Sequence, residues 1–227
     1  MASKSAQRGA DVIRLPFVRY LSIFLIGLAG LATAADQRTE QLLKQVERRY
    51  NSAITLTVHF SETYRGPGRP ARTETGTLYL LKPGKMRWEY TSPAGKLFVS
   101  DGKSVYLYLP SQHRAEKMSL KVSEDMRAPL AFLLGKLNFE KEFQTMQARP
   151  DAGGTLITAE PKTANLPYSK VEFAISPAFE IRKLRVIGQD QSILDFEFGQ
   201  ERLNPPFSAG LFQFHAPPGT EVVVAGQ

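Results

Sequence analysis

The stretch that decides the fold reads Leu78-Tyr-Leu-Leu-Lys-Pro-Gly-Lys-Met-Arg-Trp-Glu-Tyr-Thr-Ser-Pro93, and it continues after a short gap as Leu97-Phe-Val-Ser-Asp-Gly-Lys-Ser-Val-Tyr-Leu-Tyr-Leu-Pro110. Short apolar and aromatic runs are separated here by Pro83-Gly84 and by Asp101-Gly102. Runs of this kind, joined by such turn residues, are typical of antiparallel hairpins. The sequence therefore predicts two hairpins in about thirty residues.

The first hairpin is predicted to turn at Pro83-Gly84-Lys85, a loop that pairs Lys82 with Met86 and Leu80 with Trp88. One face then collects Leu78, Leu80, Met86, Trp88 and Tyr90. The other face carries Tyr79, Leu81, Arg87 and Glu89. This sorting by polarity supports the three-residue loop. It leaves Lys82 at the rim of the apolar face, where an ammonium group needs water or carbonyl acceptors.

Asp101-Gly102 predicts a two-residue turn of type I′ in the second hairpin, because both central positions of that turn require positive φ. This turn pairs Ser100 with Lys103 and Phe98 with Val105. One face carries Phe98, Val105, Leu107 and Leu109, and the other carries Leu97, Val99, Tyr106 and Tyr108. Since both faces are apolar or amphipathic, we expect this hairpin to be covered on both sides.

Turn residues recur along the rest of the chain, which predicts a mainly β (α+β) domain with a largely antiparallel sandwich or barrel. The predicted strands are 53–64, 73–82, 86–91, 97–100, 103–109, 139–148, 155–160, 169–176, 179–188, 192–198 and 211–215. A helix is expected from a cap at Asp36 to Tyr50. A second helix beginning at Pro129 carries a strongly apolar stripe, formed by Leu130, Phe132, Leu133, Leu134 and Leu137. This stripe fits either a plug that closes a barrel or a movable lid over a cavity.

The first 34 residues have the pattern of a cleavable signal peptide. Four basic residues precede a short apolar run from Tyr20 to Leu31, and Ala32-Thr33-Ala34 then supplies small residues for cleavage near Ala34-Ala35. An uncleaved N-terminal anchor is the alternative. We therefore divide the chain into a signal peptide, 1–34, and one exported domain, 35–227.

Composition excludes several classes of function. The 227 residues include no cysteine, so disulfides, thiolate nucleophiles, iron–sulfur clusters, cysteine-ligated zinc and a lipid-modified N-terminal cysteine are all ruled out. The net charge of +7 falls to +4 without the leader, which argues against nucleic-acid binding. The arginines of loop 64–72 fit either contact with an anionic partner or a solvated loop.

The sequence contains no recognisable catalytic constellation. Its three histidines are His59, His113 and His215, and none has the spacing of a metal ligand. No G-x-S-x-G elbow, P-loop or G-x-G-x-x-G motif occurs. We therefore predict a protein that is not an enzyme, with no catalytic residue, no metal and no cofactor.

The opening stretch strongly resembles the LolA family, the periplasmic carriers of outer-membrane lipoproteins. The resemblance rests on a basic residue plus proline at Lys82-Pro83, on W-x-Y-T-x-P at 88–93 and on V-S-D-G-K at 99–103. The leader, both predicted helices and a closing segment at 212–219 follow in the same order. The likeness thus extends loosely over the exported domain.

This resemblance implies an incomplete antiparallel β-barrel of about eleven strands, with an apolar concave cavity covered by short helices. The cavity would bind acyl chains of lipoproteins released by an inner-membrane LolCDE-type ABC transporter, for delivery to an outer-membrane acceptor such as LolB. The expected cavity residues are Leu78, Leu80, Met86, Trp88, Tyr90, Phe98, Val105 and Leu107. The expected lid residues are Leu130, Phe132, Leu133, Leu134 and Leu137. We expect a periplasmic monomer without nucleic-acid partners.

Lys82 stands where the family has an arginine whose hydrogen bonds to lid backbone hold the lid closed. The resemblance therefore assigns Lys82 as the lid gate, although lysine is a point donor and lacks the planar fork of arginine. Three alternatives remain. The protein could be a LolA-like carrier of another lipid, a periplasmic lipid or lipoprotein sensor that regulates envelope stress, or a lipid hydrolase.

Overall fold

The computed structural model describes residues 21–119, 137–163, 166–208 and 210–224. The chain forms two compact units that divide between Glu40 and Gln41. Helix α1 (Leu21–Ser52) runs through this boundary without a break. The predicted cap at Asp36 is therefore wrong, because the alanine-rich residues between Leu31 and Asp36 favour helix and include no glycine or proline. Within the described ranges, no helix is long and apolar enough to cross a membrane.

The second unit is built mainly from strands. Two short helical elements, η1 (Pro110–Gln112) and α3 (Phe139–Glu142), lie between them. The strands found in the described part of the chain are β1 (Thr55–Arg65), β2 (Arg72–Leu81), β3 (Lys85–Ser92), β4 (Leu97–Asp101), β5 (Ser104–Leu109), β6 (Arg114–Ser119), β7 (Phe143–Asp151), β8 (Gly154–Pro161), β9 (Tyr168–Ile175), β10 (Ile181–Gly188), β11 (Ile193–Leu203) and β12 (Glu221–Val224).

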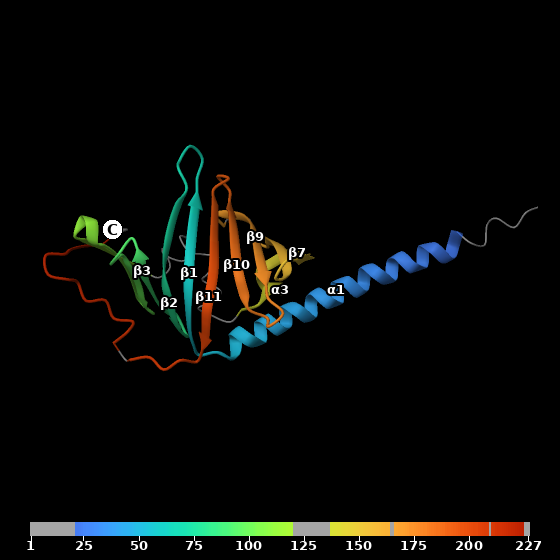
Figure 1. The fold of residues 1–227 in the computed structure, drawn as a ribbon, viewed down its shortest axis with the longest axis horizontal. Helices are drawn as coiled ribbons and strands as arrows, with labels where there is room; N and C mark the ends of the chain where they lie inside the picture. Colours follow the sequence, from blue (N-terminus) through green and yellow to red (C-terminus); the bar gives the residue numbers. More distant parts are fainter. Residues whose placement is uncertain (1–20, 120–136, 164–165, 209, 225–227) are drawn as a thin grey trace, which may run out of the picture. The chain divides into compact units, whose positions relative to one another are not determined.

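All twelve strands belong to one open sheet, in the order β12-β6-β5-β4-β3-β2-β1-β11-β10-β9-β8-β7. Figure 1 shows β1 and β11 side by side in the middle of this sheet, where they join its early and late halves. Neighbouring strands are antiparallel except β12, which pairs in parallel with β6. The predicted class, a mainly β open barrel, is confirmed. β6 and β12 were not predicted.

The sheet curls so that its two halves share one hydrophobic core. Trp88 on β3 and Phe196 on β11 are three strands apart, which would be roughly 14 Å in a flat sheet. Their ring centroids are only 5.9 Å apart. Phe60 on β1, between them, packs edge-on against Trp88 at 4.8 Å. We call the sheet face that carries these three rings the inner face, and the opposite one the outer face.

The first predicted hairpin has the expected faces but a register shifted by two residues. Leu80 pairs with Met86, so the expected pairing of Leu80 with Trp88 is wrong. Lys82 begins the turn instead of ending the strand, and its N–H donates to the carbonyl of Ile54 at 3.0 Å. A shift by two residues keeps every side chain on its predicted face, since side chains alternate with a period of two.

The second hairpin is shifted in the same way. Ser100 pairs with Val105, so the expected pairing with Lys103 is wrong. The Asp101 side chain accepts hydrogen bonds from the backbone N–H groups of Lys103 and Ser104, both at 2.8 Å. These bonds stabilise a turn whose two loop residues are Gly102 and Lys103, one position later than the predicted Asp101 and Gly102.

Residues 139–142, predicted as the start of a strand, form the helical turn α3 instead. The Asn138 side chain caps this turn by accepting a hydrogen bond from the N–H of Lys141 at 2.8 Å. Phe139 and Phe143 are both buried. Their spacing of four residues is the spacing of one helical turn, so the strand predicted to begin at Phe139 begins at Phe143 instead.

Residues 211–215, also predicted as a strand, lie in an irregular segment between β11 and β12. The N–H groups of Leu211 and Gln213 donate to the carbonyls of Ser208 and Gly210, at 3.2 and 3.0 Å. Local turns thus use donors that a strand would need for its ladder, and the strand prediction is wrong.

This irregular segment covers the outer face of the two predicted hairpins, and Figure 1 shows it crossing toward them in red. Phe207 packs edge-on against Tyr79 of β2 at 5.9 Å, and Phe214 stacks on Tyr106 of β5 at 5.0 Å. Phe212 between them is buried. The prediction that the second hairpin is covered on both sides is confirmed.

Candidate functional site

The inner face brings together the residues predicted to line a cavity. Seven of the eight are buried there, and Leu107 packs against them while partly buried: Leu78, Leu80, Met86, Trp88, Tyr90, Phe98 and Val105. They come from four adjacent strands, β2 to β5, whose inward positions are apolar. Strands β1, β9, β10 and β11 add further apolar side chains to the same cluster. The face therefore offers one continuous apolar surface.

This surface is closely packed. Trp88 is 1% exposed, and its indole N–H lies 3.2 Å from the sulfur of Met86. The gap lined by Tyr50, Leu56 and Leu80 holds only about 10 Å³, which is room for about one water molecule at most. An acyl chain can reach this face only if part of its cover moves.

The C-terminal part of α1 supplies some of that cover. Its apolar stripe, Leu43, Val46 and Tyr50, belongs to the same buried cluster as the inner face. The Lys82 ammonium donates a hydrogen bond to the carbonyl of Tyr50, in the last turn of the helix. A cation is favourable at a helix C-terminus. Burial lowers the pKa of Lys82 from its usual value.

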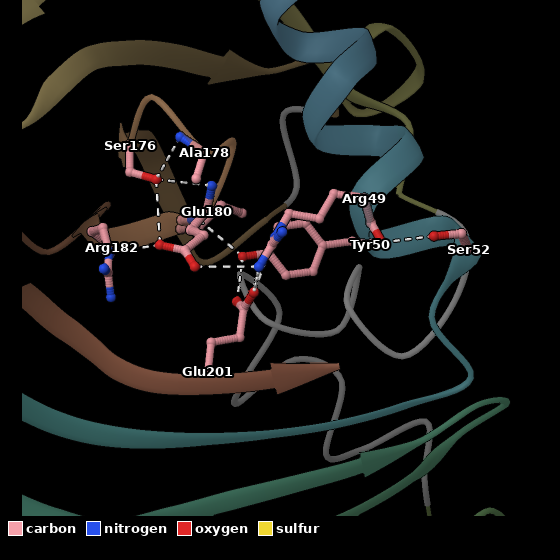
Figure 2. A network of polar contacts seen from close by, with 9 residues as sticks. Arg49, Tyr50, Ser52, Ser176, Ala178, Glu180, Arg182 and Glu201 are labelled. Atoms are coloured by element: carbon pink, nitrogen blue, oxygen red, sulfur yellow. Dashed lines mark hydrogen bonds and ion pairs between the residues drawn. The ribbon is translucent and has the colours of Figure 1, made fainter. Parts of the chain in front are cut away.

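A polar network fastens the same helix to the other half of the sheet (Figure 2). The Tyr50 hydroxyl donates to Glu201 at 2.6 Å and accepts from the N–H of Ile181 at 2.9 Å. Arg49 also donates to Glu201, at 2.6 Å, and to Glu180 at 3.3 Å. Burial, followed by the negative charge of Glu201, raises the pKa of Tyr50 far above its usual value, so this hydroxyl keeps its proton.

A β-bulge directs Glu201 into this network. Thr57 on β1 pairs with Arg202 on β11, but His59 pairs with Gly199, so Gln200 and Glu201 together face a single residue of β1. Gln200 has a φ of 52°. Bulges of this kind change the direction of a side chain, and no local pattern in the sequence indicated this one.

Two side chains of α1 also bind the segment that leads into α3. The Asn51 amide accepts from the N–H of Leu137 at 2.7 Å and donates to its carbonyl at 2.8 Å. The Glu47 carboxylate accepts from the N–H of Phe139 at 2.7 Å. Leu137, a predicted lid residue, is thus held against α1. The other predicted lid residues lie outside the described residues: Leu130, Phe132, Leu133 and Leu134.

The outer face has a different character. A hollow of about 680 Å³ over β1 and β7 to β11 has nine charged side chains among the nineteen residues that line it. Many of these charges are paired, as between Arg185 and Asp195 at 2.6 Å and between Lys183 and Glu197 at 2.7 Å. Within the described residues, no group of three histidine, aspartate or glutamate side chains could hold a metal ion.

A family model matches residues 51–215, from the end of α1 to beyond β11. It is the model of the outer membrane lipoprotein carrier protein LolA. The match spans all the strands that form the inner face. The family that it describes is a carrier family and not a family of enzymes.

Individual proteins resemble the chain over nearly its whole length. An outer-membrane lipoprotein carrier protein of Bordetella avium is 30% identical over 210 residues, 90% of this chain and 96% of that protein. A protein of the same name from Coxiella burnetii is 26% identical over 207 residues, 89% and 94% of the two chains. The crystal structure of an uncharacterized conserved protein from Thermus thermophilus aligns with a TM-score of 0.50 at 12% identity, over 82% of this chain and 99% of that one. This last likeness shows the fold alone.

Proposed function

Since the chain belongs to the LolA family of outer-membrane lipoprotein carriers, we propose that it binds the acyl chains of lipoproteins on the inner face of its sheet. The observation that carries this proposal is the continuous apolar surface around Trp88, which the open sheet leaves without a second sheet to cover it. The resemblance to this family implies acyl chains on the same surface. The protein would do no chemistry on its cargo.

Hydrophobic transfer provides the driving force. Moving one methylene from water to an apolar site is worth about 0.8 kcal/mol, so a long acyl chain gains on the order of 10 kcal/mol. Part of this energy must replace the contacts of Leu43, Val46 and Tyr50 with the inner face. A carrier that exchanges contacts of its own for contacts with cargo can bind firmly and still release its load.

The route of the cargo follows from the same family. We propose that residues 1–34 direct export to the periplasm and are cleaved near Ala34-Ala35. The exported chain would act there as a monomer. It would receive lipoproteins from an inner-membrane LolCDE-type transporter and deliver them to an acceptor such as LolB.

Quenching of Trp88 tests the position of the cargo, because this is the single tryptophan of the chain. A diacylated lipopeptide with brominated acyl chains should quench its fluorescence, since bromine quenches on contact. In the matched control, a double variant with Trp88→Phe and His59→Trp moves the indole to the outer face, and quenching should be lost. Strong quenching of the control, or none of Trp88, would overturn the proposal. Mass spectrometry of the recovered lipopeptide should show it chemically unchanged.

The gate role of Lys82 stays part of the proposal. Its hydrogen bond to the Tyr50 carbonyl holds the end of α1 beside the inner face. Lys82→Leu should loosen this cover and change the transfer of lipoprotein to the acceptor several-fold. Lys82→Arg keeps a donor and should stay close to the wild type. Unchanged transfer by the leucine variant would rule out the gate.

A further inference from the structure

The inner face does not stay apolar along its whole length. Beyond Phe60 the next inward position on β1 is Glu62, and Glu74 lies directly opposite it on β2. Next to Phe98 of β4, the preceding inward position belongs to Lys96, which directly precedes the strand. These charged side chains stand at the end of the inner face that is remote from α1.

Two of these three charged side chains are buried. The side chains of Glu74 and Lys96 are 5% and 10% exposed, and the Lys96 ammonium donates to one carboxylate oxygen of Glu74. Arg72 donates to the other oxygen. The Lys96 ammonium also lies 4.2 Å from the centroid of the Tyr90 ring. A buried ion pair adds little stability compared with an apolar pair of the same size, so stability alone does not explain these residues.

A pocket of about 610 Å³ opens beside this ion pair. It is lined by Glu62, Tyr64, Arg69, Pro70, Ala71, Arg72, Glu74 and Leu194. Leu194 and Glu62 connect it to the apolar surface, because the adjacent inward positions on their strands are Phe196 and Phe60. Within the described chain the guanidinium of Arg69 has no ion-pair partner, and it is exposed in the loop that forms one wall.

We propose that this pocket, here called the rim pocket, binds the ester-bearing polar head of the acylated cargo, with Arg69 and Arg72 as donors to its carbonyl oxygens. This inference rests on the proposed function, because it requires acyl chains on the inner face. Ester carbonyls only accept hydrogen bonds, and leaving them buried without donors is unfavourable. Arginine supplies several N–H donors in a fixed plane, and Glu74 holds Arg72 at the pocket wall.

The dimensions agree with this arrangement. Glu74 and Leu80 are separated by six residues of β2, which is roughly 20 Å of strand. A hydrocarbon core of about 30 Å holds two layers of lipid, so one acyl chain spans roughly 15 Å. A chain whose ester lies in the rim pocket can therefore run along the inner face past Leu78 toward α1.

A pair of matched ligands tests the rim pocket. One is a dipalmitoyl-glyceryl cysteine peptide, and the other is its dialkyl ether analogue, which keeps the chains but lacks the ester carbonyls. Wild-type protein, titrated through Trp88 fluorescence, should bind the ester ligand about tenfold more tightly, as expected for hydrogen bonds to charged donors. Arg69→Ala should reduce this preference, because Arg72 alone then remains as a donor, and should leave binding of the ether analogue unchanged. Arg149→Ala, an exposed arginine on β7, is the matched control and should keep the preference.

Each result has a defined consequence. Dipalmitoylglycerol has the same esters but no peptide. Arg69→Ala should weaken its binding as much as it weakens binding of the lipopeptide, and this result would assign recognition to the esters. An effect confined to the lipopeptide, or equal affinity of wild type for ester and ether, would overturn the rim pocket while leaving the carrier function intact. Binding of none of these ligands would overturn the carrier function itself, and the rim pocket with it.

Discussion

Gly76 lies on the inner face of β2, where the backbone of β3 comes unusually close. A Cβ atom at this position would stand 2.1 Å from the carbonyl oxygen of Glu89. The pairing shifts here, with Thr75 opposite Ser92 and Gly76 opposite Tyr90. The missing side chain thus permits an irregularity that brings the Tyr90 ring to 5.2 Å from Phe60.

We expect Gly76→Ala to destabilise the protein by about 1–3 kcal/mol, because the new methyl group meets backbone that cannot rotate away. Urea denaturation followed by Trp88 fluorescence measures the change. Gly153→Ala is the matched control, since no atom lies within 4 Å of its added Cβ. Equal stabilities of the two variants would show that β3 can shift at no cost.

At the scale of elements, α1 connects parts of the fold that lie far apart in the sequence. Its last turns bind the β2–β3 turn through Lys82, the β10 and β11 strands through Tyr50, and the entry to α3 through Asn51. These contacts surround the apolar stripe of the helix. The cover of the inner face is therefore held at its polar edges and not only by hydrophobic packing.

Asn51→Ala should lower the free energy of unfolding by about 2 kcal/mol, because two hydrogen bonds to Leu137 are lost and its backbone groups are left unsatisfied. Asn51→Asp keeps the acceptor for the Leu137 N–H but turns an oxygen toward the Leu137 carbonyl and adds negative charge at the end of α1, so it should be destabilising as well. Ser52→Ala is a control, since within the described residues that exposed hydroxyl bonds only to the carbonyl of Arg49 in its own helix. Denaturant titration measures all three. An alanine variant as stable as the wild type would contradict this account of the attachment.

At the scale of the whole molecule, the surface proposed for binding is the one whose burial stabilises the fold. The inner face forms the core of the second unit, and the same face is the proposed site for acyl chains. Most proteins separate these two tasks. Here the sheet is open, so the side chains that cover it can be exchanged for a ligand without breaking the strand ladder.

Hydrogen exchange should therefore show a divided response to a diacylated lipopeptide. The amides of Leu137 and Phe139, which α1 side chains hold, should exchange faster when cargo displaces the cover. Amides in the ladder between β1 and β11 should be unchanged. Slower exchange at both places would indicate that the ligand binds to the closed form, and the proposed displacement would then be wrong.

The sequence by itself determined the fold class, most strands and the faces of both early hairpins. These properties depend on the alternation of polar and apolar residues, which is local. For the same reason it placed residues such as Trp88 and Leu78 together on one apolar face. Local patterns gave wrong strands at two places. At 139–142 Asn138 caps a helical turn, and at 211–215 backbone N–H groups donate within local turns instead of to a neighbouring strand.

Only the tertiary structure decided the hairpin registers, the bulge that directs Glu201 to Tyr50, and the attachment of α1 to the sheet. The Tyr50 hydroxyl and the Glu201 carboxylate are 151 residues apart in the chain. Their contact depends on how a curled sheet brings distant strand ends together, and no short stretch of sequence encodes that. The rim pocket depends on the tertiary fold in one respect: its charged residues all lie in the β1–β2 hairpin, and pairing of distant strands brings Leu194 of β11 beside them.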